Sequence, residues 1–264
     1  MNLALSGRVA LVTGGTKGIG RAIAQALAEE GARVAVTARG ADALRKAAQE
    51  LSAWNVLAVA ADATDQKAVD SAVARVIEVH GGLDVLVNNV GGAGKLGGFA
   101  DLGDADWRYA FDLNVLSMVH FVRAAEPHLR KSKCGRIINI SSIAGVQPGA
   151  FNPHYTVTKA ATINLTQCLA KHFVGDRVLV NVVCPGPVHS DSWDANVTRL
   201  AVERGIPAEE ARLQVEREEA AKIPLGRVGE GEDIAGMVAF LASEKAGWVT
   251  GSCFHVNGGK LSTI

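Results

Sequence analysis

The chain has 264 residues, of which 48% are hydrophobic and 20% charged, and its 27 basic side chains balance 27 acidic ones. This length predicts one globular domain with a substantial core, and the zero net charge argues against a nucleic-acid binder or a binder of anionic membranes. No uncharged apolar run reaches about 18 residues, and the first residues lack a signal-peptide pattern, so we expect no membrane segment. The four scattered cysteines are typical of a cytoplasmic protein.

Short β-branched segments alternate with longer segments rich in alanine, leucine and charge. Apolar residues fill the short segments without strict alternation, as in strands that are buried on both faces of a parallel sheet. We therefore predict a single α/β domain over residues 1–264, with a doubly wound parallel sheet and helices on both faces. The strands are expected at 9–12, 33–37, 56–60, 84–87, 136–140, 178–183 and 253–256, and the helices at 20–30, 41–52, 65–80, 104–130, 152–173 and 230–242.

Residues 187–227 interrupt the alternation, because they carry two amphipathic helical segments where one crossover would suffice. These segments lie near 191–204 and 208–222. A surface insertion is one interpretation. We favour a substrate-binding lid, since long excursions at the carboxyl ends of parallel strands tend to shape ligand sites.

A glycine-rich turn follows the first predicted strand and precedes an alanine-rich helix. Its Gly-xxx-Gly-x-Gly spacing differs from the generic GxGxxG pattern, and strand-to-helix turns also use glycine for steric reasons alone. The position at a helix N-terminus nevertheless favours binding of a dinucleotide pyrophosphate, whose charge the free N–H groups attract. The candidate contacts in this turn are Gly14, Thr16, Lys17, Gly18, Ile19 and Gly20.

The end of the second predicted strand indicates which dinucleotide is bound. An NAD site usually places an acidic residue there, but this chain has Ala38 followed by Arg39. An arginine can form paired hydrogen bonds with the 2′-phosphate of NADP, and Lys17 adds a second positive charge. Arg39 can equally be a solvated surface charge. The missing acid leads us to expect NADP(H), with NAD(H) as the alternative.

A tyrosine, a lysine and two serines form the candidate catalytic group. Tyr155 and Lys159 are four residues apart and share one helix face, whereas the other tyrosine, Tyr109, has no lysine at that spacing. Ser141 and Ser142 follow the fifth predicted strand, whose carboxyl end faces the crevice of such a sheet. Turn chemistry alone would also explain the serines.

The ordered motifs resemble those of the short-chain dehydrogenase/reductase family over residues 6–260. They are Thr13-Gly14-xxx-Gly18-x-Gly20, Asn88-Asn89-Val90-Gly91, Asn114, Ser142, Tyr155-xxx-Lys159 and Pro185-Gly186. The resemblance implies a Rossmann-like sheet of about seven strands in the order 3-2-1-4-5-6-7. One motif departs from the family, which usually has alanine where this chain has Val90.

The resemblance also implies catalytic roles. Tyr155 would be the acid or base, and Lys159, together with the oxidised nicotinamide, would lower the pKa of that phenol and bind the nicotinamide ribose. Ser142 would hold the substrate oxygen, with Ser141 as the weaker candidate, and Asn114 would anchor a water in a proton relay.

Further contacts follow from the same resemblance. Asp62, Ala63, Asn89 and Gly91 would lie on the adenosine side, and Pro185, Gly186, Val188 and Ser190 on the nicotinamide side, although each could also be a cap or turn residue. The substrate would contact Ser142 and Tyr155 and an apolar wall formed by Val146, Phe151 and Trp193. We expect no metal, because the seven histidines show no paired ligand spacing.

The implied activity is NADPH-dependent reduction of a carbonyl, similar to that of the 3-oxoacyl-thioester reductases of the family. The alternatives are an NAD-dependent alcohol or sugar dehydrogenase and a nucleotide-sensing protein without catalysis. The resemblance also implies a homotetramer joined through the segments 104–130 and 152–173. The expected partner is a small carbonyl or alcohol substrate, with neither nucleic acid nor membrane as a partner.

Overall fold

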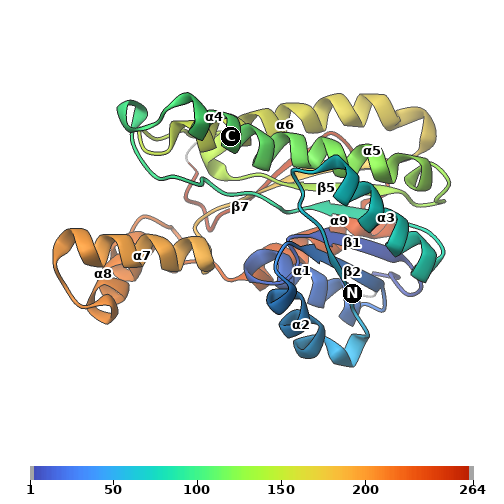
Figure 1. Ribbon diagram of the computed structural model, residues 1–264, viewed down its shortest axis with the longest axis horizontal. Helices are drawn as coiled ribbons and strands as arrows, with labels where there is room; N and C mark the ends of the chain where they lie inside the picture. The colour runs from blue at the N-terminus through green and yellow to red at the C-terminus, as the bar shows by residue number, and fades with distance from the viewer. Residues whose placement is uncertain (1–2, 262–264) are drawn as a thin grey trace.

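A parallel sheet forms the centre of the molecule (Figure 1). The computed structural model describes residues 3–261, and within them the sheet has seven strands in the order β3-β2-β1-β4-β5-β6-β7. This order confirms the predicted doubly wound topology. The strands are β1 Val9–Thr13, β2 Arg33–Ala38, β3 Leu57–Ala60, β4 Val85–Asn88, β5 Arg136–Ile140, β6 Leu179–Pro185 and β7 Cys253–Val256.

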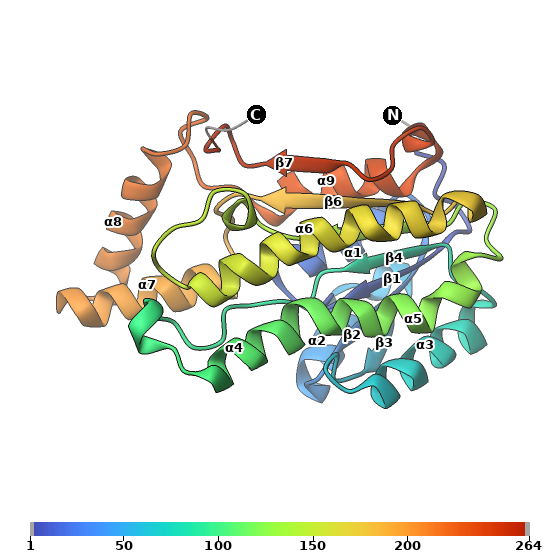
Figure 2. The ribbon, with the colours of Figure 1, turned by 90° about the horizontal axis from the view of Figure 1, so that it is seen from above.

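Helices cover both faces of the sheet, which explains why its strands lack hydrophobic alternation. Ala10 and Val12 of β1 pack toward one face, whereas Val9 and Leu11 pack toward the other. The first face carries α1 (Gly18–Glu29), α2 (Ala41–Glu50) and α9 (Gly231–Ala242), and the second carries α3 (Gln66–His80), α5 (Ser117–Leu129) and α6 (Pro153–Phe173) (Figures 1 and 2). Every β1 side chain is therefore buried.

The helix predicted over 104–130 is present, with a π-helical turn in its middle. The segment forms α4 (Asp104–Phe111), a π-helical turn over Asp112–Leu116, and then α5. The wide turn leaves a carbonyl without its regular partner, and the side-chain amide of Asn114 donates to the carbonyl of Ala110 at 2.9 Å. A hydrophobic periodicity does not reveal such a turn, because the flanking helices keep almost the same axis.

The interruption at 187–227 forms two helices, α7 (Asp191–Arg204) and α8 (Ala208–Ala220), which extend from one end of the molecule (Figure 2). Trp193, Val197, Ala211 and Val215 form a small core between them. A single β-bridge between Val188 and Gly229 closes the base of this segment. The helical hairpin thus has its own core and a narrow connection to the sheet.

Among the described residues, no helix combines the length and the apolar character that crossing a bilayer requires.

His189, near the start of the 187–227 segment, contacts both α8 and the start of α9. Its Nε2 lies 2.8 Å from Glu216 of α8 and its Nδ1 lies 2.7 Å from Glu230, at the start of α9. Partial burial lowers the pKa of His189, but the hydrogen bonds with the two carboxylates outweigh that effect and raise it above its ordinary value of 6.5.

We expect this link to make stability depend on pH. A raised folded-state pKa contributes stability that is fully present below the unfolded pKa and is lost as the pH rises through the folded pKa. The melting temperature of the wild type should therefore exceed that of His189→Gln most near pH 6, and the difference should shrink toward pH 9. Thermal unfolding of both proteins across this range checks it, and a difference that grows with pH would refute the role of His189.

Candidate active site

The glycine-rich turn lies at the carboxyl end of β1, next to the end of β4. Gly14 has a φ of +63°, a left-handed conformation that favours glycine. A β-carbon on Gly20 would collide with the carbonyl oxygen of Gly14 and with the amide of Asn89. The turn is therefore a tight cradle of bare backbone before α1, as the sequence predicts.

Asn89 holds this turn in place. Its Nδ2 donates to the carbonyls of Thr13 at 3.0 Å and of Gly14 at 3.1 Å, and its backbone N–H donates to Thr13 Oγ1 at 2.9 Å. The Asn89 side chain, which was expected to line the adenosine side, thus hydrogen-bonds to the backbone of the turn. Its observed contacts fix the shape of the cradle.

Beside the turn lies an open hollow of about 460 Å³. Lys17 lies at its rim and forms an ion pair with Asp191, the first residue of α7. No sequence signal predicts this pair, since 174 residues separate its members. Arg21 and Lys46, which also line the hollow, were not among the predicted contacts. The lining residues are Thr16, Lys17, Gly18, Arg21, Ala43, Lys46, Glu50 and Asp191.

Arg39 and Asp62 mark the carboxyl ends of β2 and β3. Arg39 is exposed and forms no ion pair within the described part of the chain. Asp62 accepts hydrogen bonds from the backbone and hydroxyl of Thr64, which, together with the positive charge of Arg39, hold the pKa of this carboxyl below its ordinary value despite a small opposing effect of burial. Ala63 beside it is buried. The exposed Arg39 thus has no carboxylate bound to it among the described residues, and its charge acts on Asp62.

Ser142 and Tyr155 come together beyond the carboxyl end of β5. Ser142 caps a 3-10 turn over Ile143–Gly145, where its Oγ accepts from the N–H of Ala144 at 3.1 Å, and its hydroxyl lies close enough to the Tyr155 phenol to influence the pKa of that phenol. Ser141 points elsewhere, because its Oγ donates to the carbonyl of Lys159 at 2.8 Å. The geometry thus favours Ser142 over Ser141 as the partner of Tyr155.

Lys159 lies one turn after Tyr155 on α6. Its Nζ is 5.6 Å from the centre of the Tyr155 ring and donates to the carbonyl of Ile140 at 2.9 Å. Burial lowers the pKa of Lys159 to about 8. The shared helix face was predicted correctly.

The expected lowering of the Tyr155 pKa depends on Lys159 and the oxidised nicotinamide together, and the protein alone shows a shift in the other direction. Burial raises the pKa of Tyr155, and the nearby Ser142 hydroxyl opposes that rise only in part. The Lys159 ammonium donates to a carbonyl, and burial lowers its own pKa. The structure therefore favours a protonated phenol.

Gly91 lies between Asn114 and Lys159. A β-carbon on Gly91 would approach Asn114 Oδ1 to 2.6 Å and Lys159 Nζ to 3.0 Å. Asn114 Oδ1 accepts from the N–H of Gly92 and its Nδ2 donates to the Gly92 carbonyl, both at 2.9 Å. The bare backbone at Gly91 thus allows the loop after β4 to approach the lysine closely.

The end of β6 leads into the base of the 187–227 segment. Pro185 is the last residue of β6, and a β-carbon on Gly186 would meet the backbone of Asn257 at 2.8 Å. Val188 is buried in the bridge with Gly229. Ser190 caps α7, because its Oγ accepts from the N–H of Trp193 at 3.4 Å, so its side chain has a structural role that the sequence analysis had left open.

Of the three residues expected to form an apolar wall of the substrate pocket, one is buried elsewhere. Val146 is half-buried, and Phe151 is exposed with the guanidinium of Arg199 in α7 at 5.1 Å from its ring centre. Trp193 is only 8% exposed, because it packs inside the core of the α7–α8 hairpin. Trp193 is therefore observed as a packing residue rather than as a lining of the crevice.

Comparison with known proteins identifies a family model and several relatives that match almost the whole chain. A family model described as enoyl-(acyl carrier protein) reductase matches residues 14–260. Sorbitol dehydrogenase of Cereibacter sphaeroides is 35% identical over 97% of this chain and 98% of the relative. A 3-oxoacyl-[acyl-carrier-protein] reductase of Staphylococcus aureus is 36% identical over 95% of this chain and 96% of the relative.

Among solved structures, L-sorbose reductase of Gluconobacter frateurii, complexed with NADPH and L-sorbose, superposes with a TM-score of 0.93 at 34% identity, and the match covers 100% of both chains. The match includes the sheet, the glycine-rich turn and the α7–α8 segment. These relatives are oxidoreductases with different substrates, so they establish kinship without establishing a substrate. The chain belongs to the short-chain dehydrogenase/reductase family.

Proposed function

We propose that this protein is an NADPH-dependent oxidoreductase that interconverts a ketone and a secondary alcohol, with Tyr155 as the acid or base. The observation that carries this proposal is the grouping of Ser142, Tyr155 and Lys159 next to a bare-backbone cradle at the same edge of the sheet. A nucleotide-sensing protein without catalysis would have no use for this arrangement.

A dinucleotide fits the residues that are present. Gly14, Gly18 and Gly20 leave bare backbone at the N-terminus of α1, where a pyrophosphate finds N–H groups and a favourable helix dipole. Arg39 would hold the 2′-phosphate, and Asp62, Ala63 and Gly91 would line the adenosine side. Lys159, Pro185, Gly186 and Val188 would lie on the nicotinamide side, and NADPH, when bound there, supplies the hydride.

The protein's own contribution is the proton and its position. Because burial raises the pKa of Tyr155, its phenol holds the proton that a developing alkoxide needs, and Tyr155 Oη donates it to the substrate oxygen during reduction. Ser142 donates a hydrogen bond to the same oxygen. The Lys159 ammonium stabilises the phenolate that remains, and Asn114 fixes the loop that approaches Lys159. A water held at Asn114 would return the proton through Lys159.

The cofactor preference tests the role of Arg39. We expect Arg39→Ala to weaken NADPH binding by roughly tenfold to a hundredfold, since a hydrogen bond to a charged group contributes about 1.5 to 3 kcal/mol. NADH binding should change little. Titration calorimetry with both cofactors measures this ratio, and Arg45→Ala is a matched control, because Arg45 is also exposed but pairs with Asp42. An unchanged NADPH-to-NADH ratio in Arg39→Ala would contradict the assignment.

The full-length likeness to L-sorbose reductase favours a second substrate class, ketoses and polyols, beside the 3-oxoacyl thioesters. A panel of both classes, assayed in both directions with NADPH and NADH, separates them. Turnover of a thioester alone supports the 3-oxoacyl activity, and turnover of ketoses or polyols alone supports the sugar activity. An absence of turnover with every member of the panel would refute the proposed oxidoreductase.

The same proposal includes the organisation of the chain. Residues 1–264 would act as one dinucleotide-binding domain, with 187–227 as the substrate lid and with Val146 and Phe151 on the substrate side. A homotetramer through α4, α5 and α6 would cover the exposed apolar side chains of Tyr109, Phe111, Leu116 and Val157. We place the enzyme in the cytoplasm, where its four cysteines would stay reduced.

A further inference from the structure

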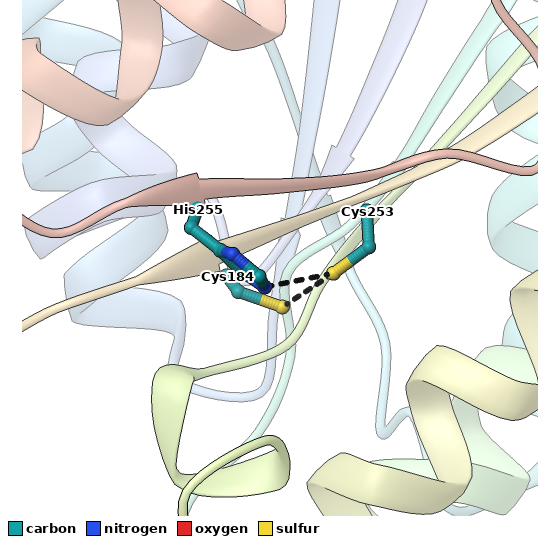
Figure 3. A group of neighbouring side chains, drawn as sticks. All are labelled: Cys184, Cys253 and His255. Carbon is teal, nitrogen blue, oxygen red and sulfur yellow. Dashed lines mark hydrogen bonds between the residues drawn. The ribbon is translucent and has the colours of Figure 1, made fainter. Parts of the chain in front are cut away.

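Two cysteines and a histidine converge on one face of the sheet, at its β7 edge. Cys184 belongs to β6, whereas Cys253 and His255 belong to β7, and their side chains point toward one another (Figure 3). The Sγ atoms of Cys184 and Cys253 are 3.4 Å apart, and Cys253 Sγ is also 3.4 Å from His255 Nε2. All three candidate ligand atoms lie within 4.8 Å of one another.

The strand register produces this convergence. Cys184 is the register partner of His255, and Cys253 lies two residues before His255, so all three side chains are on the same face. Since 69 residues separate the two cysteines in sequence, the spacing of histidines and cysteines could not reveal the group. The only local signal was the Cys-x-His pair on one strand.

The separations match those of ligands around one tetrahedral ion. Two thiolates at about 2.3 Å from a zinc ion lie about 3.8 Å apart, and a thiolate and an imidazole lie about 3.6 Å apart. The observed 3.4 Å separations need only small side-chain movements to reach these values. Thiolate and imidazole are also the ligands that zinc and similar ions prefer over magnesium and calcium.

The register argues against a disulfide as the main use of this cysteine pair. In a regular parallel ladder, residues on neighbouring strands offset by two positions have α-carbons about 8 Å apart, whereas disulfides span about 4.4 to 6.8 Å. Cys184 and Cys253 have this offset. A shared ion bridges such an offset without movement of the strands.

We propose that Cys184, Cys253 and His255 bind a divalent transition-metal ion, with Zn²⁺ as the fitting species. Cys184 is buried and anchors the ion to the sheet, while the exposed His255 gives the ion a path from solvent. Three protein ligands leave the fourth tetrahedral position to water. Cys184 lies close to Ser142 and Tyr155, so the ion would be bound beside the proposed catalytic group, although nothing in the proposed oxidoreductase reaction requires it.

Cobalt substitution tests the site directly. The full-length protein, with its thiols kept reduced by a phosphine and its metals removed by a chelator, is titrated with Co²⁺. We expect one ion per chain, near-ultraviolet charge-transfer absorption from two thiolates, and the visible bands of tetrahedral cobalt. Zn²⁺ should then displace Co²⁺ and abolish both signals.

Variants assign the ligands. Cys253→Ser should remove about half of the charge-transfer absorption, and His255→Ala should retain that absorption but weaken Zn²⁺ binding by about a hundredfold, since even residues that only support a metal ligand contribute tenfold to a hundredfold. Cys168→Ser is the matched control, because Cys168 is a free, exposed cysteine on α6, and it should behave as the wild type.

Two results would overturn the proposal. One is wild-type protein that shows no thiolate-to-cobalt absorption at one equivalent of Co²⁺. The other is an equal loss of signal in Cys168→Ser and Cys253→Ser, which would indicate binding to thiols in general. Circular dichroism of each variant, compared with the wild type, identifies a variant that fails to fold, and His255→Ala provides an independent test because its side chain is exposed.

Discussion

Tyr155→Phe is expected to lower kcat by about a thousandfold and to leave the Kd for NADPH within about twofold of the wild-type value, because a positioned acid contributes about a hundredfold to ten-thousandfold to proton transfer. The substitution removes one oxygen and keeps the ring against Lys159. Ser142 keeps its hydrogen bond with the N–H of Ala144. Steady-state kinetics and NADPH fluorescence titration measure the two effects separately.

Tyr109→Phe is the matched control. Tyr109 is the other tyrosine of the chain, and it is partly exposed on α4, with its ring near Gly94. We expect Tyr109→Phe to retain wild-type kcat. If Tyr155→Phe turned over its substrate at the rate of Tyr109→Phe, Tyr155 would not be the acid.

Gly91→Ala is the second substitution with a large expected effect. Its methyl group would approach Asn114 Oδ1 to 2.6 Å and Lys159 Nζ to 3.0 Å, so the loop or the lysine must move. We expect kcat to fall by about a hundredfold, as when a catalytic group is displaced by about 1 Å. Unfolding should cost about 1 to 3 kcal/mol less than in the wild type, the usual effect of overpacking.

Gly92→Ala separates this steric effect from a general effect of alanine in the loop. A β-carbon on Gly92 meets only Leu113, at the ordinary contact distance of 3.8 Å. Kinetics and thermal unfolding of both variants should therefore show a large loss in Gly91→Ala and a small one in Gly92→Ala. Equal losses would mean that the approach of Gly91 to Lys159 does not matter for the reaction.

The fold could be predicted from the sequence because its signals are local. Apolar runs such as 9–12 lie between alanine-rich helices, and burial on both faces follows from that pattern. The Tyr155–Lys159 pair could also be predicted from the sequence, since a spacing of four residues on a helix places both side chains on one face. The glycine-rich turn could be predicted as a phosphate-binding site because it lies between a strand and the N-terminus of a helix, where free N–H groups attract negative charge.

The rest depended on contacts between distant parts of the chain. The pairing of Lys17 with Asp191 and the convergence of Cys184 with Cys253 join elements that only the folded sheet brings together. Trp193 has a large apolar side chain of the kind that lines ligand pockets, but packing against the neighbouring helix α8 buries it. The burial of Tyr155 and Lys159, which raises the pKa of the phenol and lowers that of the ammonium in the protein alone, likewise depends on the folded sheet.

Deuterium transfer tests the central claim most directly. NADPH that carries deuterium at the transferable position of its nicotinamide is mixed with the ketone substrate, and the product alcohol is analysed by mass spectrometry for the wild type and for Tyr155→Phe. We expect one deuterium on the carbinol carbon with the wild type and almost no product with the variant. An unlabelled alcohol from the wild type, or equal amounts of labelled product from both proteins, would contradict it.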